Sequence, residues 1–224
     1  ATQRKAKKKP QRQMPSWLRY VIAGLIAFLF LAAFFYFFIR PYSYRWKPCY
    51  GFKAYGVCMP SGFQVHGIDV SHYQGNIDWK MLTQTRQGKF PIHFVFMKAS
   101  EGGDYGDKAF ITNFDSAKTH GFIRGAYHFY NPKTDPIRQA DFFINSVKLD
   151  SGDLPPVLDI EKRGKDENQL RRDLKLWLDK IEQHYKVKPI LYTSYKFKTR
   201  YLNDSVFNSY PYWIAHYYVD SVEY

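Results

Sequence analysis

The hydrophobic residues of the chain follow two patterns, and the first is one uninterrupted run near the N-terminus. Residues 20–39 contain no charged side chain and are almost entirely apolar. A helix needs about 20 such residues to cross a hydrocarbon core of roughly 30 Å. Trp17, Tyr20 and Tyr36 place aromatic rings near the ends of the run, as is typical of membrane interfaces. The run predicts a transmembrane helix. The alternative is a cleaved signal peptide, which has a shorter apolar region and small residues at its cleavage site.

The segments on either side of this run predict its orientation. Residues 1–19 form a basic arm without apolar periodicity, and positive flanks remain on the cytoplasmic side of a membrane. We therefore expect a single-pass anchor in the cell membrane, with the N-terminus in the cytoplasm. Residues 40–63 would be an exported connector, and residues 64–224 a periplasmic or extracellular domain, which we expect to be a monomer.

The second pattern is an alternation of short apolar runs with longer segments of helical periodicity, which begins at Val65. Such alternation predicts parallel strands joined by helices, and even spacing of the units favours a barrel. The expected fold class is therefore α/β, with a TIM-like (β/α) barrel. The predicted strands are 65–70, 92–99, 122–130, 156–160, 189–193 and 212–217, and the predicted helices are 77–86, 108–120, 134–147 and 167–185, with a short helical turn near 195–201.

Charge and composition narrow the class of partner. The formal net charge is +13, but residues 1–40 hold eight of the 33 Lys and Arg residues and no acid, which leaves a surplus of five for the rest. A mildly basic domain fits a polyanionic partner such as cell wall. Nucleic acid is a weak alternative, because the strongest basic run belongs to the predicted anchor. The sequence has neither a Gly-rich phosphate loop nor a His-rich metal cluster, so we expect no cofactor and no metal.

Both cysteines of the chain lie in the connector. Cys49 and Cys58 are separated by eight residues, and an even number of cysteines in an exported segment favours a disulfide. The alternative is a pair of free thiols. Two cysteines without a nearby pair of histidines provide too few ligands for a metal site.

The candidate chemistry centres on the segment Pro155-Pro156-Val157-Leu158-Asp159-Ile160-Glu161. Side chains alternate along a strand, so Asp159 and Glu161 are expected on one face, with Cα atoms roughly 6–7 Å apart. Such a pair suits cleavage of a glycosidic bond, in which one carboxyl protonates the leaving oxygen. The alternative is a strand edge whose acids pair with Lys162 and Arg163.

Further polar and aromatic residues follow the other predicted strands. In a barrel, functional side chains gather at the carboxyl ends of the strands. There the sequence places carboxylates and aromatic rings, an inventory that suits a carbohydrate: Asp69, Lys98, Glu101, Tyr127, His128, Asp159, Glu161, Tyr192, Trp213, His216 and Tyr217.

The segment His66-Gly67-Ile68-Asp69-Val70-Ser71-His72-Tyr73-Gln74-Gly75-Asn76-Ile77-Asp78-Trp79 closely resembles the opening motif of glycoside hydrolase family 25, the Chalaropsis-type lysozymes. Further matching motifs follow in the family's order: 94–102, 125–130, 156–161, 191–193 and 213–217. The resemblance implies a modified (β/α) barrel with fewer helices than strands. It also implies N-acetylmuramidase activity, which cleaves the β-1,4 bond between N-acetylmuramic acid and N-acetylglucosamine in peptidoglycan.

The resemblance also assigns roles to residues. Glu161 would be the general acid/base, Asp159 would orient or polarise the 2-acetamido group or stabilise the charged intermediate, and Asp69 would assist at the face of the sugar. Glu101 would be a supporting residue. A nucleophile on the enzyme and the substrate's own acetamido group both remain open as mechanisms. Because the longer side chain reaches the glycosidic oxygen, we expect Glu161 to hold the proton that the pair shares. We expect the substrate-binding residues to be Tyr127, His128, Tyr192, Trp213 and Tyr217.

The family's domain usually continues for a few tens of residues beyond the motif at Trp213, so we expect the last strands of the barrel to be missing. Two other functions remain possible. One is a non-catalytic module that binds cell-wall glycan with the same fold. The other is a glycosidase that acts on another N-acetylated polymer, such as chitin, which the motif at 66–79 disfavours.

Overall fold

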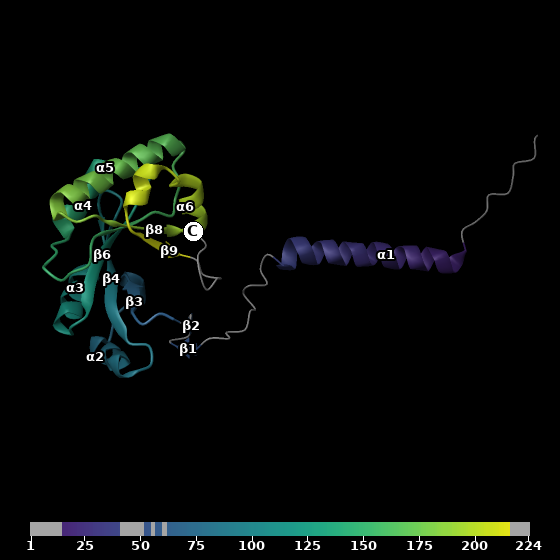
Figure 1. Cartoon of the computed structure of the whole chain (residues 1–224), viewed down its shortest axis with the longest axis horizontal. Helices are drawn as coiled ribbons and strands as arrows, with labels where there is room; N and C mark the ends of the chain where they lie inside the picture. The colour runs from purple at the N-terminus through teal and green to yellow at the C-terminus, as the bar shows by residue number, and fades with distance from the viewer. Residues whose placement is uncertain (1–14, 41–51, 55–56, 60–61, 216–224) are drawn as a thin grey trace, which may run out of the picture. The chain divides into compact units, whose positions relative to one another are not determined.

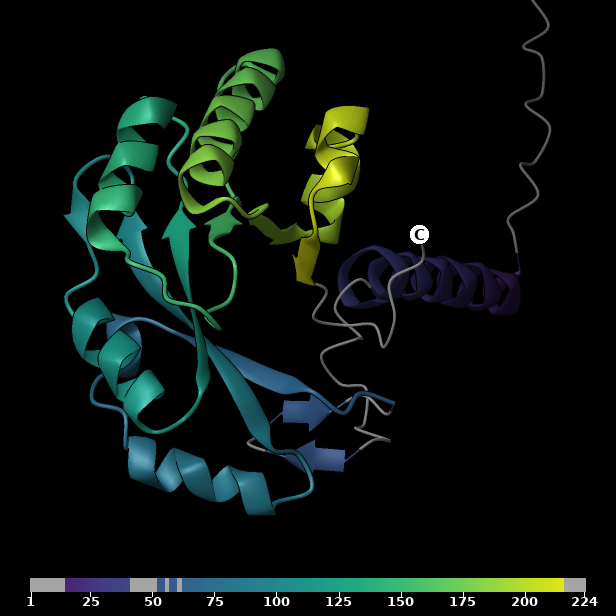
Figure 2. The same ribbon diagram turned by 60° about the vertical axis from the view of Figure 1, so that its left-hand side comes forward.

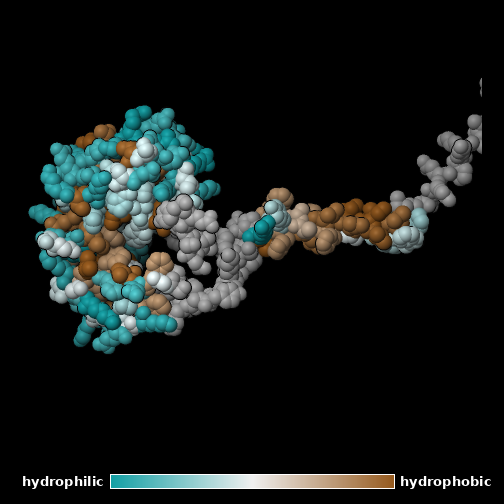
Figure 3. All heavy atoms as spheres, viewed as in Figure 1, coloured by the Kyte–Doolittle hydropathy of each residue, from teal (hydrophilic) through white to brown (hydrophobic). Residues whose placement is uncertain are grey.

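The computed structural model describes residues 15–40, 52–54, 57–59 and 62–215. The chain divides into two compact units, residues 1–50 and residues 51–224, and each is described by itself. The first contains the α-helix α1 (Ser16–Phe34), which continues as a π-helical turn, η1 (Phe35–Ile39). No residue of α1 is buried, and Figure 3 shows its surface as hydrophobic along nearly its whole length. The helix is long and apolar enough to cross a membrane.

The second unit is built on a mainly parallel sheet with strand order β3-β4-β6-β7-β8-β9 (Figure 1). The strands alternate with helices, as the sequence predicts. A separate antiparallel pair, β1 and β2, precedes the sheet. The strands are β1 (Phe52–Ala54), β2 (Val57–Met59), β3 (His66–Val70), β4 (Ile92–Glu101), β5 (Tyr105–Gly106), β6 (Ile123–Phe129), β7 (Val157–Asp159), β8 (Ile190–Ser194) and β9 (Tyr212–Ala215).

The helices of this unit lie between successive strands. Side-chain caps fix the N-termini of α4 and α5: Asp135 accepts a hydrogen bond from the backbone N–H of Arg138 at 2.8 Å, and Asp166 accepts one from that of Gln169 at 2.7 Å. The helices are α2 (Trp79–Thr83), α3 (Phe110–Thr119), α4 (Pro136–Ser146), α5 (Glu167–Tyr185) and α6 (Tyr195–Tyr201), with 3₁₀ turns η3 (His72–Gln74), η4 (Gln84–Gln87) and η5 (Ser205–Ser209).

One face of the sheet carries the hydrophobic core. Helices α4 and α5 lie side by side over this face (Figures 1 and 2). Trp177 and Leu178 of α5 and Phe143 of α4 are fully buried, together with Leu158 of β7 and Leu191 of β8. We call this helix-covered side the outer face. Because side chains alternate along a strand, Asp159 and Tyr192 point to the opposite, inner face.

The sheet curls around its inner face. Phe96 of β4 and Trp213 of β9 pack with their ring centroids 5.1 Å apart. Three strands separate β4 from β9, so in a flat sheet these strands would lie roughly 19 Å apart. The contact therefore requires strong curvature, which Figure 2 shows as a half-barrel.

The prediction of six parallel strands is confirmed, whereas closure into a full barrel is not observed. Within the described residues, β3 and β9 form the two ends of the hydrogen-bonded order. The predicted last strand, 212–217, is observed as far as Ala215, and its final two residues lie outside the described residues. The two-residue strand β5, which pairs antiparallel with β4, was not predicted.

Two glycines make room for the aromatic rings of β4 on the inner face. A Cβ atom on Gly125 of β6 would lie 2.3 Å from the Phe96 ring, and one on Gly67 of β3 would lie 2.1 Å from the Phe94 ring. Phe94 and Phe96 contact each other with centroids 5.8 Å apart. The rings thus lie flat over neighbouring strands, and this arrangement brings Phe96 to Trp213.

We predict that Gly125→Ala destabilises the fold by about 1–3 kcal/mol, because the new methyl group displaces Phe96 from a packed position. Urea unfolding followed by tryptophan fluorescence would measure the loss. Gly106→Ala is the matched control, since a Cβ atom there meets nothing nearer than 3.9 Å. Equal effects of the two substitutions would contradict this account of the inner face.

Candidate active site

The carboxyl ends of the parallel strands surround a small cavity on the inner face. Its volume is about 130 Å³. Two of the predicted catalytic acids in its lining, Asp159 and Glu161, come from β7 and from the loop that follows it. The third acid, Asp69, comes from β3. The full lining is Asp69, Tyr127, Val157, Asp159, Glu161, Tyr192 and Trp213. The structure therefore brings together most of the residues that the sequence selected.

Strand register explains why these side chains meet. Asp159 pairs with Phe129 of β6 on one side and with Tyr192 of β8 on the other, and Tyr192 pairs with Trp213 of β9. Phe129 pairs in turn with Glu101 of β4. Neighbours in a sheet point to the same face, so these five residues form one row across the inner face. We call Glu101, Phe129, Asp159, Tyr192 and Trp213 the catalytic row.

Aromatic rings form one wall of the cavity. Tyr192 and Trp213 pack edge to face, with ring centroids 4.8 Å apart, and Phe96 supports Trp213 from the other side. A flat apolar ring beside hydroxyl and carboxyl groups suits a sugar, which has apolar C–H faces and polar edges. The row therefore combines a stacking surface with acids.

Asp159 is the most buried acid of the site. Its relative exposure is 8%, and among the described residues its Oδ1 atom has no hydrogen-bond partner. Burial and, after it, the nearby charge of Glu161 raise the pKa of Asp159 to about 8, although the ammonium of Lys98 opposes both effects. A carboxyl in this position is mostly protonated at neutral pH.

This result corrects the expectation that Glu161 holds the shared proton. Glu161 is exposed, because it lies two residues beyond the end of β7, in the loop that leaves the sheet. Water therefore hydrates its carboxylate, whereas Asp159 lies within the concave face. In the protein without substrate, burial assigns the proton to Asp159.

Lys98 forms an ion pair with Glu101, the member of the catalytic row that β4 contributes. The Nζ of Lys98 lies 2.6 Å from Oε2 of Glu101, and the side chain of Lys98 is 8% exposed. Residues three apart on a regular strand point to opposite faces, but β4 carries one extra residue, Ala99, where its register with β6 shifts. This bulge brings both side chains to the inner face. Lys98 is among the residues expected at strand ends, but it was not predicted as a site residue, because a bulge leaves no periodic signal in the sequence.

Asp69 and Tyr127 lie beside each other at the mouth of the cavity. Partial loss of hydration raises the pKa of Asp69 above its ordinary value of 3.8. The pKa of Tyr127 is also raised, first by burial and then by the charges of Asp69 and Asp159. Tyr127 therefore remains a neutral hydroxyl group, able to donate a hydrogen bond to a substrate oxygen.

A histidine–aspartate pair borders the same mouth and was not predicted. Nδ1 of His72 lies 2.7 Å from Oδ2 of Asp107, whose side chain is fully buried. Asp107 also accepts hydrogen bonds from the backbone N–H groups of His72, at 3.0 Å, and Ala109, at 2.9 Å. These bonds outweigh burial and lower the pKa of Asp107. The pair fixes the turn that follows β3, and so the end of the strand that carries Asp69.

His128 lies on the outer face, away from the other predicted residues. It is fully buried and stacks on Trp177, with ring centroids 5.7 Å apart. Gln139 donates from Nε2 to two backbone carbonyls, so its Oε1 accepts the Nε2–H of His128, and Nδ1 accepts the hydroxyl of Ser100 at 2.8 Å. Burial lowers the pKa of His128 to about 4. His128 therefore does not line the active-site cavity.

Three other predicted residues cannot be placed. Tyr217 and Cys49 lie outside the described residues, and the structure describes only the backbone of Cys58, so the predicted disulfide stays a prediction. Within the described part of the chain, no group of three or more His, Cys, Asp or Glu side chains is arranged to hold a metal ion.

The raised pKa of Asp159 predicts a stability that depends on pH. Between about pH 4 and pH 8 the folded protein keeps a proton that the unfolded chain has released, so this group lowers the free energy of unfolding as the pH rises. Asp159→Asn cannot ionise. We expect it to match the unmodified protein at pH 4 and to exceed its stability at pH 9 in urea unfolding.

Asp104→Asn is the control for this pH prediction, because the Asp104 side chain is 81% exposed. It should leave the difference between pH 4 and pH 9 unchanged. If Asp159→Asn loses stability with rising pH as steeply as the unmodified protein, Asp159 is not the group that holds the proton.

Comparison with known proteins agrees with this geometry. The model of the family described as Glycosyl hydrolases family 25 matches residues 68–224. "Uncharacterized protein YegX" of Escherichia coli K12 is 37% identical over 176 residues, 78% of this chain and 63% of that protein. "Lysozyme M1" of Streptomyces globisporus is 33% identical over 175 residues, 70% of this chain and 56% of that protein.

A solved structure supports the same assignment. A family 25 glycosyl hydrolase from Bacillus anthracis superposes with a TM-score of 0.60 and 31% identity, over 66% of this chain and 68% of that one. The chain thus spans less than two thirds of the two curated relatives named above. Since the family model covers most of the sequence, including every strand that contributes to the cavity, the chain belongs to glycosyl hydrolase family 25.

Proposed function

We propose that the chain is a lysozyme-type N-acetylmuramidase that cleaves the β-1,4 bond between N-acetylmuramic acid and N-acetylglucosamine in peptidoglycan. The observation that carries the proposal is the active-site cavity, whose lining combines the buried acid Asp159 and the exposed Glu161 with the aromatic rings of Tyr192 and Trp213. "Lysozyme M1" and the "N,O-diacetylmuramidase" of Chalaropsis sp., which is 36% identical over 107 residues, support the choice of substrate.

Glu161 is the general acid in this proposal. It lines the cavity from a loop, is exposed, and has a side chain long enough to meet the oxygen of a bound glycosidic bond. The proton that Asp159 holds in the free protein passes to Glu161 as positive charge develops on the sugar ring above Asp159, and Glu161 donates it to that oxygen as the bond breaks. The same carboxyl then removes a proton from the water that completes hydrolysis.

Asp159 acts on the acetamido group of the same sugar. Its unpartnered Oδ1 atom and its raised pKa suit a carboxyl that exchanges one proton with a bound amide. Positive charge that develops above Asp159 favours its ionised form, so the acid stabilises the transition state more than the ground state. Lys98 and Glu101 hold a balanced charge pair below it. This arrangement serves both a covalent intermediate and substrate assistance.

The aromatic wall binds the glycan strand, and Asp69 and Tyr127 supply polar contacts at its edge. Tyr192 and Trp213 offer rings to the apolar face of a sugar, and Tyr127 offers a neutral hydroxyl. Tyr217 stays a predicted substrate-binding residue. Peptidoglycan is therefore the proposed partner, and the protein is proposed to act as a monomer.

We predict that Glu161→Gln lowers kcat on purified peptidoglycan by about 10²–10⁴-fold, the usual contribution of general acid catalysis. Binding of glycan fragments should persist, because the aromatic wall is intact. Asp159→Asn should also reduce kcat. Release of reducing ends measures the rate, and mass spectrometry of the new ends distinguishes muramic acid from glucosamine.

Glu167→Gln, in the first turn of α5, is the matched control for the charge change and should retain full activity. A Glu161→Gln variant as fast as the unmodified protein would rule out the assigned role. An unmodified protein that binds glycan and never cleaves it would favour the wall-binding module. Cleavage of chitin in preference to peptidoglycan would favour the other alternative.

We also propose that α1 and η1 anchor the catalytic domain in the cell membrane, with the basic N-terminal arm in the cytoplasm. The length and apolar surface of residues 16–39 support a membrane span, and the positive arm supports the orientation. This topology places the domain where cell wall is found.

A topology test uses fusions at the C-terminus. We expect alkaline phosphatase fused there to be active, since it requires export, and green fluorescent protein fused there by the same route to be dark. The membrane fraction should contain the fusion at its full length. A fluorescent cytoplasmic fusion, or a soluble product that lacks α1, would contradict the anchor.

A further inference from the structure

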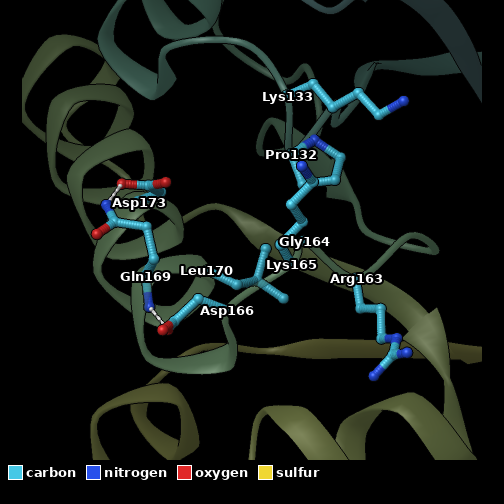
Figure 4. Close-up of a pocket in the computed structure, with 9 residues that line it drawn as sticks. All are labelled: Pro132, Lys133, Arg163, Gly164, Lys165, Asp166, Gln169, Leu170 and Asp173. Atoms are coloured by element: carbon cyan, nitrogen blue, oxygen red, sulfur yellow. Dashed lines mark hydrogen bonds between the residues drawn. The ribbon is translucent and has the colours of Figure 1, made fainter.

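A second, larger cavity lies beside the proposed active site and has no part in the mechanism above. Its volume is about 880 Å³. It opens between the loop after β6, which contains Pro132 and Lys133, and the loop after β7, which contains Arg163 and Lys165 (Figure 4). The first turns of α5 close its third side through Gln169 and Leu170.

The charges that line this cavity are unevenly paired. Both acids of the lining contact Gln169: Asp166 accepts from its backbone N–H at 2.7 Å, and Asp173 accepts from its Nε2 at 2.6 Å (Figure 4). Lys133, Arg163 and Lys165 are exposed, and none makes a salt bridge with an acid among the described residues. The lining therefore holds three cations and two acids, a net charge of +1, and the neutral Gln169 holds both carboxylates in place.

Apolar groups complete the lining. Leu170 is 3% exposed, and Pro132 from the opposite loop presents its ring to the same space. A surface of this kind suits a ligand that carries carboxylates on a backbone with small apolar side chains. A purely ionic ligand would gain nothing from Leu170 and Pro132.

The chain itself connects the two cavities. Glu161 lines the active-site cavity, and the loop runs directly from it into Lys162, Arg163, Gly164 and Lys165. The side chain of Lys162 lies over the catalytic row, because its Nζ is 4.7 Å from the centre of the Phe129 ring. A substrate at Glu161 is thus adjacent to the cationic cavity.

We propose that this cavity binds the carboxylates of the peptide stem carried by the muramic acid residue under cleavage. The proposal rests on the proposed muramidase function and deepens it, because it assigns a site to the peptide as well as to the glycan. The stem is a short peptide, rich in small side chains and free carboxylates, that leaves the sugar through its lactyl group. Lys133, Arg163 and Lys165 bind its carboxylates, and Pro132 packs against its methyl groups.

The distances permit this arrangement. Along an extended backbone, the Cα atom of Arg163 lies at most about 7 Å from that of Glu161, and the Cα atom of Lys165 at most about 14 Å. A stem of four or five residues spans at most about 13–18 Å. A stem that begins on the sugar beside Glu161 is therefore long enough to reach Arg163 and Lys165.

The test measures binding of two glycan fragments to the full chain carrying Glu161→Gln, which prevents cleavage. One fragment bears its stems, and the other is the same fragment after an amidase has removed them. The triple variant Lys133→Gln, Arg163→Gln, Lys165→Gln should weaken binding of the stem-bearing fragment by about 3–30-fold, since exposed ion pairs contribute modestly. Binding of the stripped fragment should not change, and the difference should shrink in high salt.

A matched control removes the same charge elsewhere. Lys80, Lys148 and Lys196 are exposed and line neither cavity, so replacing all three by Gln should leave both affinities unchanged. Equal loss for both fragments in the first triple variant, no loss for either, or the same loss in the control would overturn the proposal. So would the finding that polyglycerol phosphate, rather than the free stem peptide, displaces the stem-bearing fragment.

The outcome is distinguishable from failure of the proposed function. In the chain with Glu161 intact, the first triple variant should hydrolyse the stripped glycan at the unmodified rate and show a higher KM for stem-bearing strands alone. If the unmodified protein neither binds nor cleaves any muramic-acid glycan, the muramidase proposal fails. If it cleaves both substrates and the triple variant has the same KM for each, the muramidase stands and the peptide site does not.

Discussion

The contact between Phe96 and Trp213 is the interaction on which the geometry of the site depends. It joins the second strand of the parallel order to the last, across a span that a flat sheet would make roughly 19 Å. It is possible because Gly67 and Gly125 leave their space to the rings of β4. With the sheet curled in this way, Asp69 from the first strand faces the same cavity as Tyr192 and Trp213 from the last two.

Curvature also sets the electrostatics. A concave surface removes water from the carboxyl group nearest its centre, and that group is Asp159 rather than the longer Glu161. The two acids, separated by one residue in sequence, therefore differ in hydration. The positions of the two acids in the fold thus leave Glu161 hydrated and Asp159 buried.

The sequence predicted the strands, the alternation and most of the cavity because each of these depends on local periodicity or on a recognisable motif. The prediction that Tyr127 and His128 both bind substrate conflicts with alternation, because adjacent residues on one strand point to opposite faces. Asp107 follows a strand of only two residues, too short for any periodic signal. The assignment of the shared proton was wrong because burial of Asp159 depends on strands far from it in sequence.

The bulge at Ala99 has a consequence for how this site can change over evolutionary time. The extra residue, Ala99, lies between Lys98 and Glu101, which point to the same face. Its carbonyl accepts a hydrogen bond from the backbone N–H of Asp107 at 2.9 Å. The bulge thus supports both the ion pair between Lys98 and Glu101 and the position of Asp107, which binds His72. Substitution of Ala99 leaves the number of residues between Lys98 and Glu101 unchanged and keeps the backbone carbonyl that accepts a hydrogen bond from Asp107. Deletion of Ala99 would keep Lys98 and Glu101 on one face, because residues two apart on a regular strand point the same way, but it would remove the carbonyl that accepts a hydrogen bond from Asp107. The backbone of Ala99 is therefore under a stricter constraint than its side chain.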